Sequence, residues 1–214
     1  MRLLVINPNS SASVTRRIEM AIRSVITSRY DVLAIEATSA PALIINENDN
    51  SQAEQAVVDT VKHLGNKFDG IIVASFGDTG VYALRQWVTC PVIGIGHSAL
   101  LTACAIGGPF AIVSFSPAVI PSMQQVVERY GMQHLLNGIH VVETPLPEDP
   151  GAIQVAVRGP LLELCKHIAE QGECRSIILG GGPLAGLAHQ FAPEINIPII
   201  DAPIAAVNLL RTLH

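Results

Sequence analysis

Short apolar runs alternate with longer segments of mixed apolar and polar residues along the whole chain. Uninterrupted apolar runs are typical of strands buried on both faces of a parallel sheet, and the mixed segments have the pattern of helices that cover such a sheet. This alternation predicts an α/β fold with eight strands. The predicted strands are Leu3–Asn7, Val32–Ala37, Gly70–Ser75, Val92–Ile95, Phe110–Ser114, Ile139–Glu143, Ser176–Gly180 and Ile197–Asp201. The predicted helices begin near Ser13, Ser51, Thr79, Ser98, Val119, Gly151, Leu184 and Ala202.

The second half of this pattern repeats the first. Ser114 lies 107 residues after Asn7, and the segment that begins at Ile197 lies 107 residues after the one that begins at Cys90. Such a repeat predicts two similar halves related by a pseudo-twofold axis, each a mostly parallel four-stranded sheet flanked by helices, with a ligand cleft between them. We expect residues 1–98 and the C-terminal helix, about 202–214, to form the first half, and residues 99–201 to form the second.

Composition narrows the range of partners. The chain has 214 residues, of which 49% are hydrophobic, and its net charge is −5 without a cluster of Lys or Arg. Nucleic acids and anionic membranes require a basic surface, so neither is an expected partner. The apolar runs end well before the roughly 20 residues that cross a bilayer. A small molecule is therefore the expected partner.

The cysteines and histidines indicate neither disulfides nor a metal site. The four cysteines are far apart, and the N-terminus lacks the extended apolar stretch of a signal peptide, which together predict a reduced, cytoplasmic location. No two histidines have the i, i+4 spacing of a helical zinc site. We expect no bound metal.

The predicted ligand site lies beyond the carboxyl ends of the strands, where loops and helix N-termini expose unpaired backbone N–H groups. Strand ends from both halves should face one cleft, and they are rich in glycine and small hydroxyl residues. Such groups bind carboxylate or carbonyl oxygens without a formal cation. These strand ends are Asn7–Ser10, Ser75–Gly80 and Gly96–Ser98 in the first half, and Ser114–Ser116, Gly180–Pro183 and Asp201–Pro203 in the second.

Several of these segments also carry a family resemblance. "LLVINPNSSASVT", "DGIIVASFGDTGVYALRQ", "CPVIGIGHSALLTACAIGGPFAIVS", "IILGGGPLAGLA" and "IPIIDAPIAAV" resemble the Asp/Glu/hydantoin racemase superfamily, and most closely its hydantoin and allantoin racemase branch. The similarity spans nearly the whole chain. It implies an enzyme without a cofactor that acts at a carbon next to a carbonyl of a small hydantoin-like or amino-acid-like substrate. It also implies a homo-oligomer.

The resemblance further implies two cysteines, one per half, that face each other across the substrate and carry its proton. A thiol with a pKa near 8.5 is readily tuned toward neutrality, whereas an unassisted hydroxyl is far too weak an acid to serve as a base. Here the two family positions hold Ser75 and Gly181, and a glycine cannot carry a proton. The two-cysteine mechanism is therefore not possible with this sequence.

His97 is the candidate that could replace part of the missing chemistry. It directly follows the fourth predicted strand, from where it could activate Ser75 or donate a proton itself, with Asp78 or Asp201 to orient it. Ser75 and His97 are thus the predicted catalytic residues. The predicted substrate-binding residues are Asn7, Asn9, Phe76, Gly77, Asp78, Ser114, Ser116, Gly181 and Gly182. Capping of a helix is the alternative role of the Asn7–Ser10 turn, and core packing is the alternative role of Phe76.

Three classes of function remain open. The first is a racemase or epimerase that uses Ser75 with help from a second acid. The second is hydrolysis, decarboxylation or elimination on a related small molecule, for which one activated hydroxyl suffices. The third is a protein that binds a small molecule in the cleft without chemistry.

Overall fold

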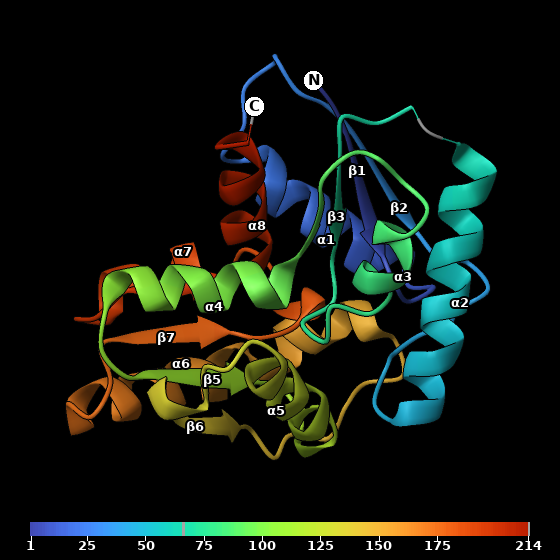
Figure 1. The fold of residues 1–214 in the computed structure, drawn as a ribbon. Helices are drawn as coiled ribbons and strands as arrows, with labels where there is room; N and C mark the ends of the chain where they lie inside the picture. The colour runs from blue at the N-terminus through green and yellow to red at the C-terminus, as the bar shows by residue number, and fades with distance from the viewer. Residues whose placement is uncertain (66, 214) are drawn as a thin grey trace.

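A computed structural model describes residues 1–65 and 67–213. It confirms the predicted α/β fold, because the strands form two four-stranded sheets in which all neighbours are parallel (Figure 1). The strands are β1 (Arg2–Asn7), β2 (Asp31–Glu36), β3 (Gly70–Val73), β4 (Val92–Gly94), β5 (Phe110–Ser114), β6 (Leu136–Val141), β7 (Ser176–Leu179) and β8 (Ile199–Asp201). The helices are α1 (Ala12–Arg23), α2 (Glu47–Leu64), α3 (Val81–Arg85), α4 (Ile95–Ile106), α5 (Ile120–Arg129), α6 (Ile153–Gln171), α7 (Leu187–Phe191) and α8 (Ala202–Arg211).

The two sheets have the same topology. Their strand orders are β2-β1-β3-β4 and β6-β5-β7-β8, so each strand of the first sheet has its counterpart four strands later in the chain. Figure 1 shows the strands of the first sheet running vertically and those of the second running horizontally. The predicted pair of similar halves is therefore confirmed. The central strands are β1 and β3 in one half and β5 and β7 in the other.

The first sheet buries both of its faces. Leu3 and Val5 of β1 belong to one apolar cluster, whereas Leu4 and Ile6 point to the opposite face and belong to a second. Residues of α2 and α3 complete the second cluster. The first cluster continues through α1 and α8 into the second sheet. The two halves thus share one core, which limits their independent movement.

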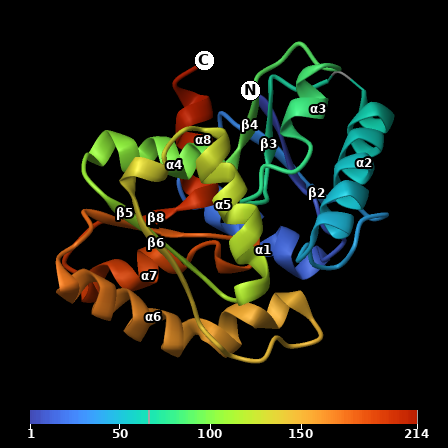
Figure 2. The same cartoon turned by 60° about the horizontal axis from the view of Figure 1, so that its bottom comes forward.

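The last helix, α8, follows the second sheet in the chain but packs against the first half. It contacts α1, α4, β3 and β4, and Figures 1 and 2 both place it beside α4. Leu210 of α8 lies so close to Gly70 at the start of β3 that a side chain at position 70 would displace it. The predicted division at residues 98 and 99 falls within α4, and this boundary stays a prediction.

Some elements begin or end at other residues than the pattern predicted. The helix after β4 starts at Ile95 rather than near Ser98, because a carboxylate from outside the helix caps its first turn. The helix α2 starts at Glu47 rather than near Ser51, because the Asn46 side chain accepts the N–H of Asp49. The strand β6 pairs with β5 from Leu136 onward and ends opposite the last residue of β5.

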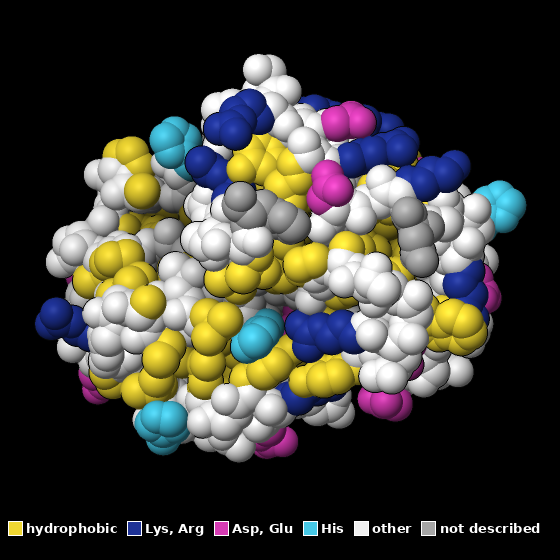
Figure 3. All heavy atoms as spheres, turned by 45° about the horizontal axis from the view of Figure 1, so that its top comes forward, with side chains coloured by type: hydrophobic (Ala, Val, Ile, Leu, Met, Phe, Trp, Pro, Cys, Tyr) yellow, Lys and Arg dark blue, Asp and Glu magenta, His cyan; other side chains and the backbone are white. Residues whose placement is uncertain are grey.

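Charged side chains of both signs share the side of the molecule that carries the two chain ends. Figure 3 looks toward this side and shows Lys and Arg side chains with Asp, Glu and apolar side chains between them. Arg2, for example, lies 3.7 Å from the carboxylate of Asp31. Over residues 1–65 and 67–213, no helix is both long enough and apolar enough to span a membrane.

Candidate functional site

A cavity of about 60 Å³ lies between the two halves, at the carboxyl ends of the central strands β1, β3, β5 and β7. The first half contributes Asn9, Leu43, Ile44, Asn50, Ala74, Ser75, Phe76, Gly77 and Thr79, and the second contributes Phe115, Val119, Ser122, Met123, Gly181, Gly182 and Pro183. The structure therefore brings Ser75 and Gly181 to the same cavity from the equivalent strands β3 and β7.

Two wider grooves of about 530 and 550 Å³ lie elsewhere on the surface. One runs between α1 and α7 and is lined by Arg16, Met20 and His189 among others. The other is lined by residues before and within β4, together with His97, Leu209 and Leu213. Neither contains Ser75 or Gly181, so the smaller cavity is the one that joins the predicted site residues of both halves.

The segment Ser75–Thr79, called the Ser75 loop below, holds the serine in a defined position. The backbone N–H of Thr79 donates to Ser75 Oγ over 3.1 Å, and the N–H of Asp78 donates to the Ser75 carbonyl over 3.1 Å. The serine hydroxyl accepts in the first of these bonds, so its own proton stays available for an oxygen of a ligand. Ser75 can thus act as a hydrogen-bond donor in the cavity.

The opposite position is shaped so that only glycine fits. Gly181 has φ +116° and ψ 141°, a backbone conformation that residues with a side chain rarely adopt. A Cβ atom at this position would lie 2.8 Å from Cε1 of Phe115. The ring of Phe115, which is buried and lines the cavity, therefore occupies the space that a side chain at position 181 would need.

Two buried carboxylates join corresponding loops and helices in the two halves. Asp78, in the Ser75 loop, accepts the N–H groups of Gly96 (2.9 Å) and His97 (3.0 Å) at the start of α4. Asp201, at the end of β8, caps α8 and also accepts the N–H of Gly186 (2.6 Å) in the β7–α7 loop. In each half a buried carboxylate thus joins a β–α loop to the helix that follows the last strand. The carboxylate belongs to the loop in the first half and to the end of the strand in the second. Burial raises the pKa of each carboxyl group to about 6.

These raised pKa values predict a pH-dependent stability. The pKa of Asp201 is about 6 in the folded chain but about 3.9 when unfolded, so the folded state binds this proton more tightly. The free energy of unfolding should therefore fall as pH rises from about 4 to above 6, by about 3 kcal/mol for this group. Asp201→Asn should lose this contribution, which urea unfolding between pH 4 and 7.5 would measure.

The comparison with Asp201→Asn isolates one group. Burial lowers the pKa of His97 and of His140, which makes stability rise with pH over their titration range, and Asp78 adds a second falling contribution. All three are present in both proteins and cancel in the difference. Parallel stability curves for the two proteins would show that Asp201 is not protonated more readily in the folded state.

His97, predicted to be catalytic, lies outside the cavity lining. Its ring stacks on that of Tyr130, with centroids 3.7 Å apart and an angle of 7° between the planes. Its backbone N–H donates to the carboxylate of Asp78, a buried residue of the Ser75 loop that does not line the cavity either. A catalytic role of His97 and substrate binding by Asp78 stay predictions.

Of the two asparagines in the first turn, Asn9 lines the cavity and Asn7 supports it. The Asn7 amide donates to Asn9 Oδ1 (2.8 Å), to Thr15 Oγ1 (3.1 Å) and to the Ser11 carbonyl (3.3 Å). With three acceptors inside the protein, this amide is used to order the turn that presents Asn9. The N-cap of α1 is Ser11, one residue beyond the Asn7–Ser10 turn, so the alternative role of Ser10 as the helix cap is wrong.

The serines at the end of β5 have structural partners. Ser114 is fully buried, and its hydroxyl donates to the carbonyl of Gly180 over 2.7 Å, which ties β5 to the end of β7. Ser116 Oγ accepts the N–H of Ala118 and so caps the short helical turn that follows. Phe76, Gly77, Gly181 and Gly182, the remaining predicted binding residues, all line the cavity.

The structure adds residues that the strand-end argument did not include. The Thr79 hydroxyl donates to Oδ1 of Asn50, in α2, over 2.7 Å. The Asn50 side chain also lines the cavity. Ser122 and Met123 come from α5, and Leu43 and Ile44 from the connection between β2 and α2. These residues come from helices and a long loop. The sequence around each is typical of a helix start or a packed helix face, so it carries no signal of a binding site.

The cavity is neutral. Among the described residues that line it there is no Asp, Glu, Lys, Arg or His. Polar groups come from Asn9, Asn50, Ser75, Thr79 and Ser122, while most of the remaining surface is apolar. Binding a full charge without a compensating group is costly, so the lining favours an uncharged ligand with polar atoms along one edge.

The fold and site define a two-lobed α/β protein with a small-molecule cavity between equivalent strand ends. The model of the Asp/Glu/Hydantoin racemase family matches residues 3–210, and the chain belongs to this family. It is 27% identical to hydantoin racemase from Paenarthrobacter aurescens, over 100% of this chain and 91% of that protein. It is 29% identical to hydantoin racemase from Rhizobium meliloti, over 100% of this chain and 88% of that protein.

A solved structure agrees with these relatives. Allantoin racemase from Klebsiella pneumoniae superimposes with a TM-score of 0.90 at 29% sequence identity, covering 100% of this chain and 87% of that chain. The similarity therefore extends over both halves and the cavity between them. The predicted resemblance to the family is confirmed.

Proposed function

We propose that this protein acts, without a cofactor, at a carbon next to a carbonyl of a small hydantoin-like substrate, as a racemase-type enzyme. The observation that carries the proposal is that Ser75 and Gly181, from equivalent strand ends, line one cavity. The family resemblance implies two proton-carrying cysteines at these positions, and this supports the proposal. The substrate carbon is accordingly proposed to lie between them.

The lining favours a hydantoin-like ring over a free amino acid. A free amino acid carries a carboxylate and an ammonium group, whereas the cavity offers amide, hydroxyl and backbone groups. A neutral ring with carbonyl and N–H groups on its edge matches those donors and acceptors. The apolar side chains Leu43, Ile44 and Met123 would then contact an apolar substituent of the ring.

The proposed chemistry rests on stabilising the enolate that forms when the α proton leaves. The Ser75 hydroxyl would donate to the enolate oxygen, and so would the backbone N–H of Gly182, where a helical turn begins. A water molecule would accept the α proton and another would return one, since the described lining contains no thiol, carboxyl or imidazole. Because each missing acid or base is worth about 10²- to 10⁴-fold, we expect slow turnover.

The proposal is tested with enantiopure 5-substituted hydantoins and allantoin in deuterium oxide, by following optical rotation, α-deuteration and mass together. Loss of rotation with α-deuteration supports racemisation. A new mass without α-deuteration of the starting material would replace the proposal by hydrolysis, decarboxylation or elimination. Free aspartate and glutamate serve as charged comparison substrates, and preferential turnover of these would contradict the argument from the neutral lining.

One observation favours a second candidate, a protein that binds the ring without inverting it. Gly181 offers only backbone on its side of the cavity, and the Phe115 ring fills the adjacent space. Protonation from that side would then be hindered. A thermal shift with hydantoins, with neither change of rotation nor deuteration, would favour this candidate.

Replacing Ser75 by alanine should reduce α-deuterium exchange about tenfold or more, because it removes a donor to the developing oxyanion. Where exchange is below detection, the same variant should weaken hydantoin binding, as measured by calorimetry. Ser98→Ala is the matched control, since the Ser98 hydroxyl donates to the Gly94 carbonyl at the N-cap of α4 and lies outside the cavity lining. Equal effects of the two substitutions would argue against a role for the Ser75 hydroxyl.

A further inference from the structure

The C-terminal end of α5, in the second half, contacts the Ser75 loop of the first half. Arg129 Nη1 donates to the carbonyl of Gly77 over 3.3 Å, and the Tyr130 hydroxyl donates to Asp78 Oδ2 over 3.0 Å. Gly77 and Asp78 both belong to the Ser75 loop. Two neighbouring side chains of one half therefore hold the loop that presents Ser75 in the other.

Asp78 transmits this contact to Ser75. Its N–H donates to the Ser75 carbonyl, and its carboxylate accepts from Tyr130 and from two N–H groups of α4. Asp78 is also the non-glycine residue with positive φ, 53°, in the described chain, a conformation that costs free energy unless other contacts stabilise it. The hydrogen bonds to its carboxylate are the contacts that stabilise the conformation of the loop.

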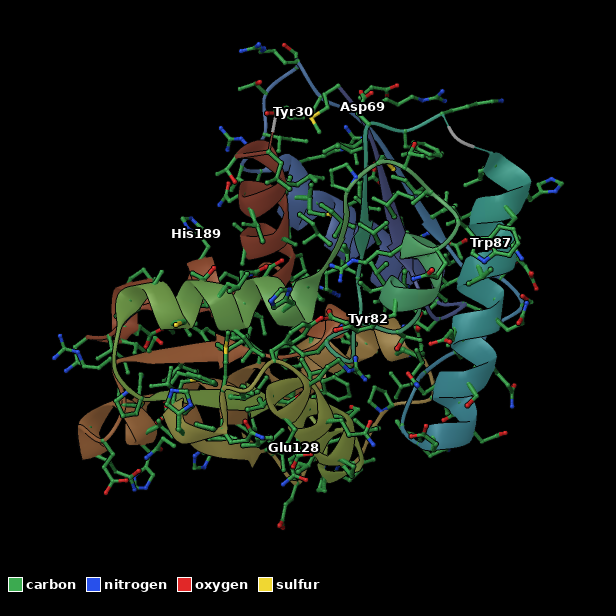
Figure 4. The ribbon with its side chains drawn as sticks, viewed as in Figure 1. Tyr30, Asp69, Tyr82, Trp87, Glu128 and His189 are labelled. Carbon is green, nitrogen blue, oxygen red and sulfur yellow. The ribbon has the colours of Figure 1, made fainter. Side chains whose placement is uncertain are left out.

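The Tyr130 ring is held in place by the His97 ring, on which it stacks. A second neighbour of Tyr130 is Tyr82, and the guanidinium groups of Arg85 and Arg129 lie 5.5 and 5.6 Å from the ring centre of Tyr82. Figure 4 shows Tyr82 below α3, on the side where the second half lies. The stacking on His97 keeps the Tyr130 ring where its hydroxyl donates to Asp78.

The same helix also faces the cavity, because Ser122 and Met123 of α5 line it. A ligand that contacts Ser122, Met123 and Ser75 therefore touches both α5 and the Ser75 loop that the end of α5 holds. We infer that Tyr130 is a positioning residue: its hydroxyl, bonded to Asp78 across the two halves, holds the Ser75 loop in the geometry that a ligand requires. This inference depends on the proposed function for the identity of that ligand, but not for the loop geometry itself.

The test is Tyr130→Phe, which removes the hydroxyl and keeps the ring stacked on His97. Amide hydrogen exchange, followed by NMR on ¹⁵N-labelled protein, should be about tenfold faster or more at Asp78, Thr79, Gly96 and His97. Hydantoin α-deuteration should fall in kcat by a similar factor with a smaller change in KM. Tyr30→Phe is the matched control, because Tyr30 lies near the chain ends, far from α5 (Figure 4).

A third variant separates the Tyr130 hydroxyl from the His97 ring. His97→Phe keeps the backbone N–H that Asp78 accepts and an aromatic ring for stacking, so amide exchange at Asp78, Thr79 and Gly96 should stay as in the unaltered protein. Unchanged amide exchange in Tyr130→Phe, or an equal increase in Tyr30→Phe, would overturn the inference. Faster amide exchange with full turnover would overturn the positioning role. Faster amide exchange in a protein that turns over no hydantoin would leave the inference standing and count against the proposed function.

Discussion

The double variant S75C/G181C is expected to racemise a 5-substituted hydantoin no faster than the unaltered protein, whereas S75C/F115L/G181C should racemise it at least about 100-fold faster than either. The two cysteines restore the proton carriers that the family resemblance implies. A thiol at position 181 has no room beside Phe115, because even its Cβ would lie 2.8 Å from the ring. Leucine at position 115 shortens this side chain while keeping it apolar. Optical rotation of an enantiopure hydantoin measures the outcome.

The loss of stability caused by a side chain at position 181 has to be measured separately. A side chain at position 181 also needs a new backbone conformation, which costs about 1–3 kcal/mol, so thermal unfolding must show that all variants are folded. S75C/F115L carries only the first of the two introduced thiols. It therefore serves as the control for the enlarged cavity without the thiol at position 181. Racemisation by the double variant at the rate of the triple one would mean that Phe115 does not block the second side. Racemisation by none of the folded variants would mean that positions 75 and 181 do not flank the reacting carbon.

The positions of Ser75 and Gly181 illustrate what local pattern can predict. Each follows a buried run of apolar residues, and the rule that parallel strands end at one edge of a sheet places each at the cavity side. The family resemblance, rather than the pattern, singled out these two strand ends as a facing pair. The pattern alone predicted that both segments border the cleft, because each follows an apolar run typical of a strand buried on both faces.

Asp78 shows where such reasoning stops. Its place directly after the strand end suggested contact with substrate, but its positive φ turns the side chain away toward the start of α4. That start carries no capping residue of its own, since Gly94 provides no side chain. A carboxylate can cap the helix that follows it in the chain or a helix that follows a different loop. Which of the two it caps depends on how closely two segments distant in sequence approach each other. The sequence pattern contains no direct signal for that approach.

Asn50 was not predicted at the cavity, and Phe115, although part of the predicted strand end Ser114–Ser116, was not predicted as a binding residue, for a related reason. Each residue type has a common structural explanation, an aromatic core side chain and a polar residue in the first turn of a helix. Their role at the cavity comes from the packing of the two halves against each other, which brings α2 and the end of β5 to the same place. Packing between halves is a property of many contacts at once, and single positions do not reveal it.

The close approach between α4 and the Ser75 loop leads to the second prediction of large effect. Gly96→Ala is expected to lower the free energy of unfolding by about 3 kcal/mol or more. Alanine is favoured over glycine in helices by about 1 kcal/mol, which alone would stabilise the protein. A Cβ at position 96, however, would overlap the backbone carbonyl oxygen of Phe76 and lie 3.2 Å from Asp78 Oδ1. Because a backbone oxygen cannot rotate away, the steric cost should exceed the gain in helix propensity.

Gly159→Ala provides the matched comparison, measured by urea unfolding under the same conditions. Gly159 is also helical, in α6, but nothing lies within 4 Å of the place its Cβ would take. The gain in helix propensity is opposed there by the preference of residues before Pro160 for extended backbone, so stability should change by less than about 1 kcal/mol. Similar stabilities of the two variants would mean that the start of α4 does not lie against the Ser75 loop. In that case the hydrogen bonds of Asp78 to Gly96 and His97 would also need to be reconsidered, since they depend on the same approach.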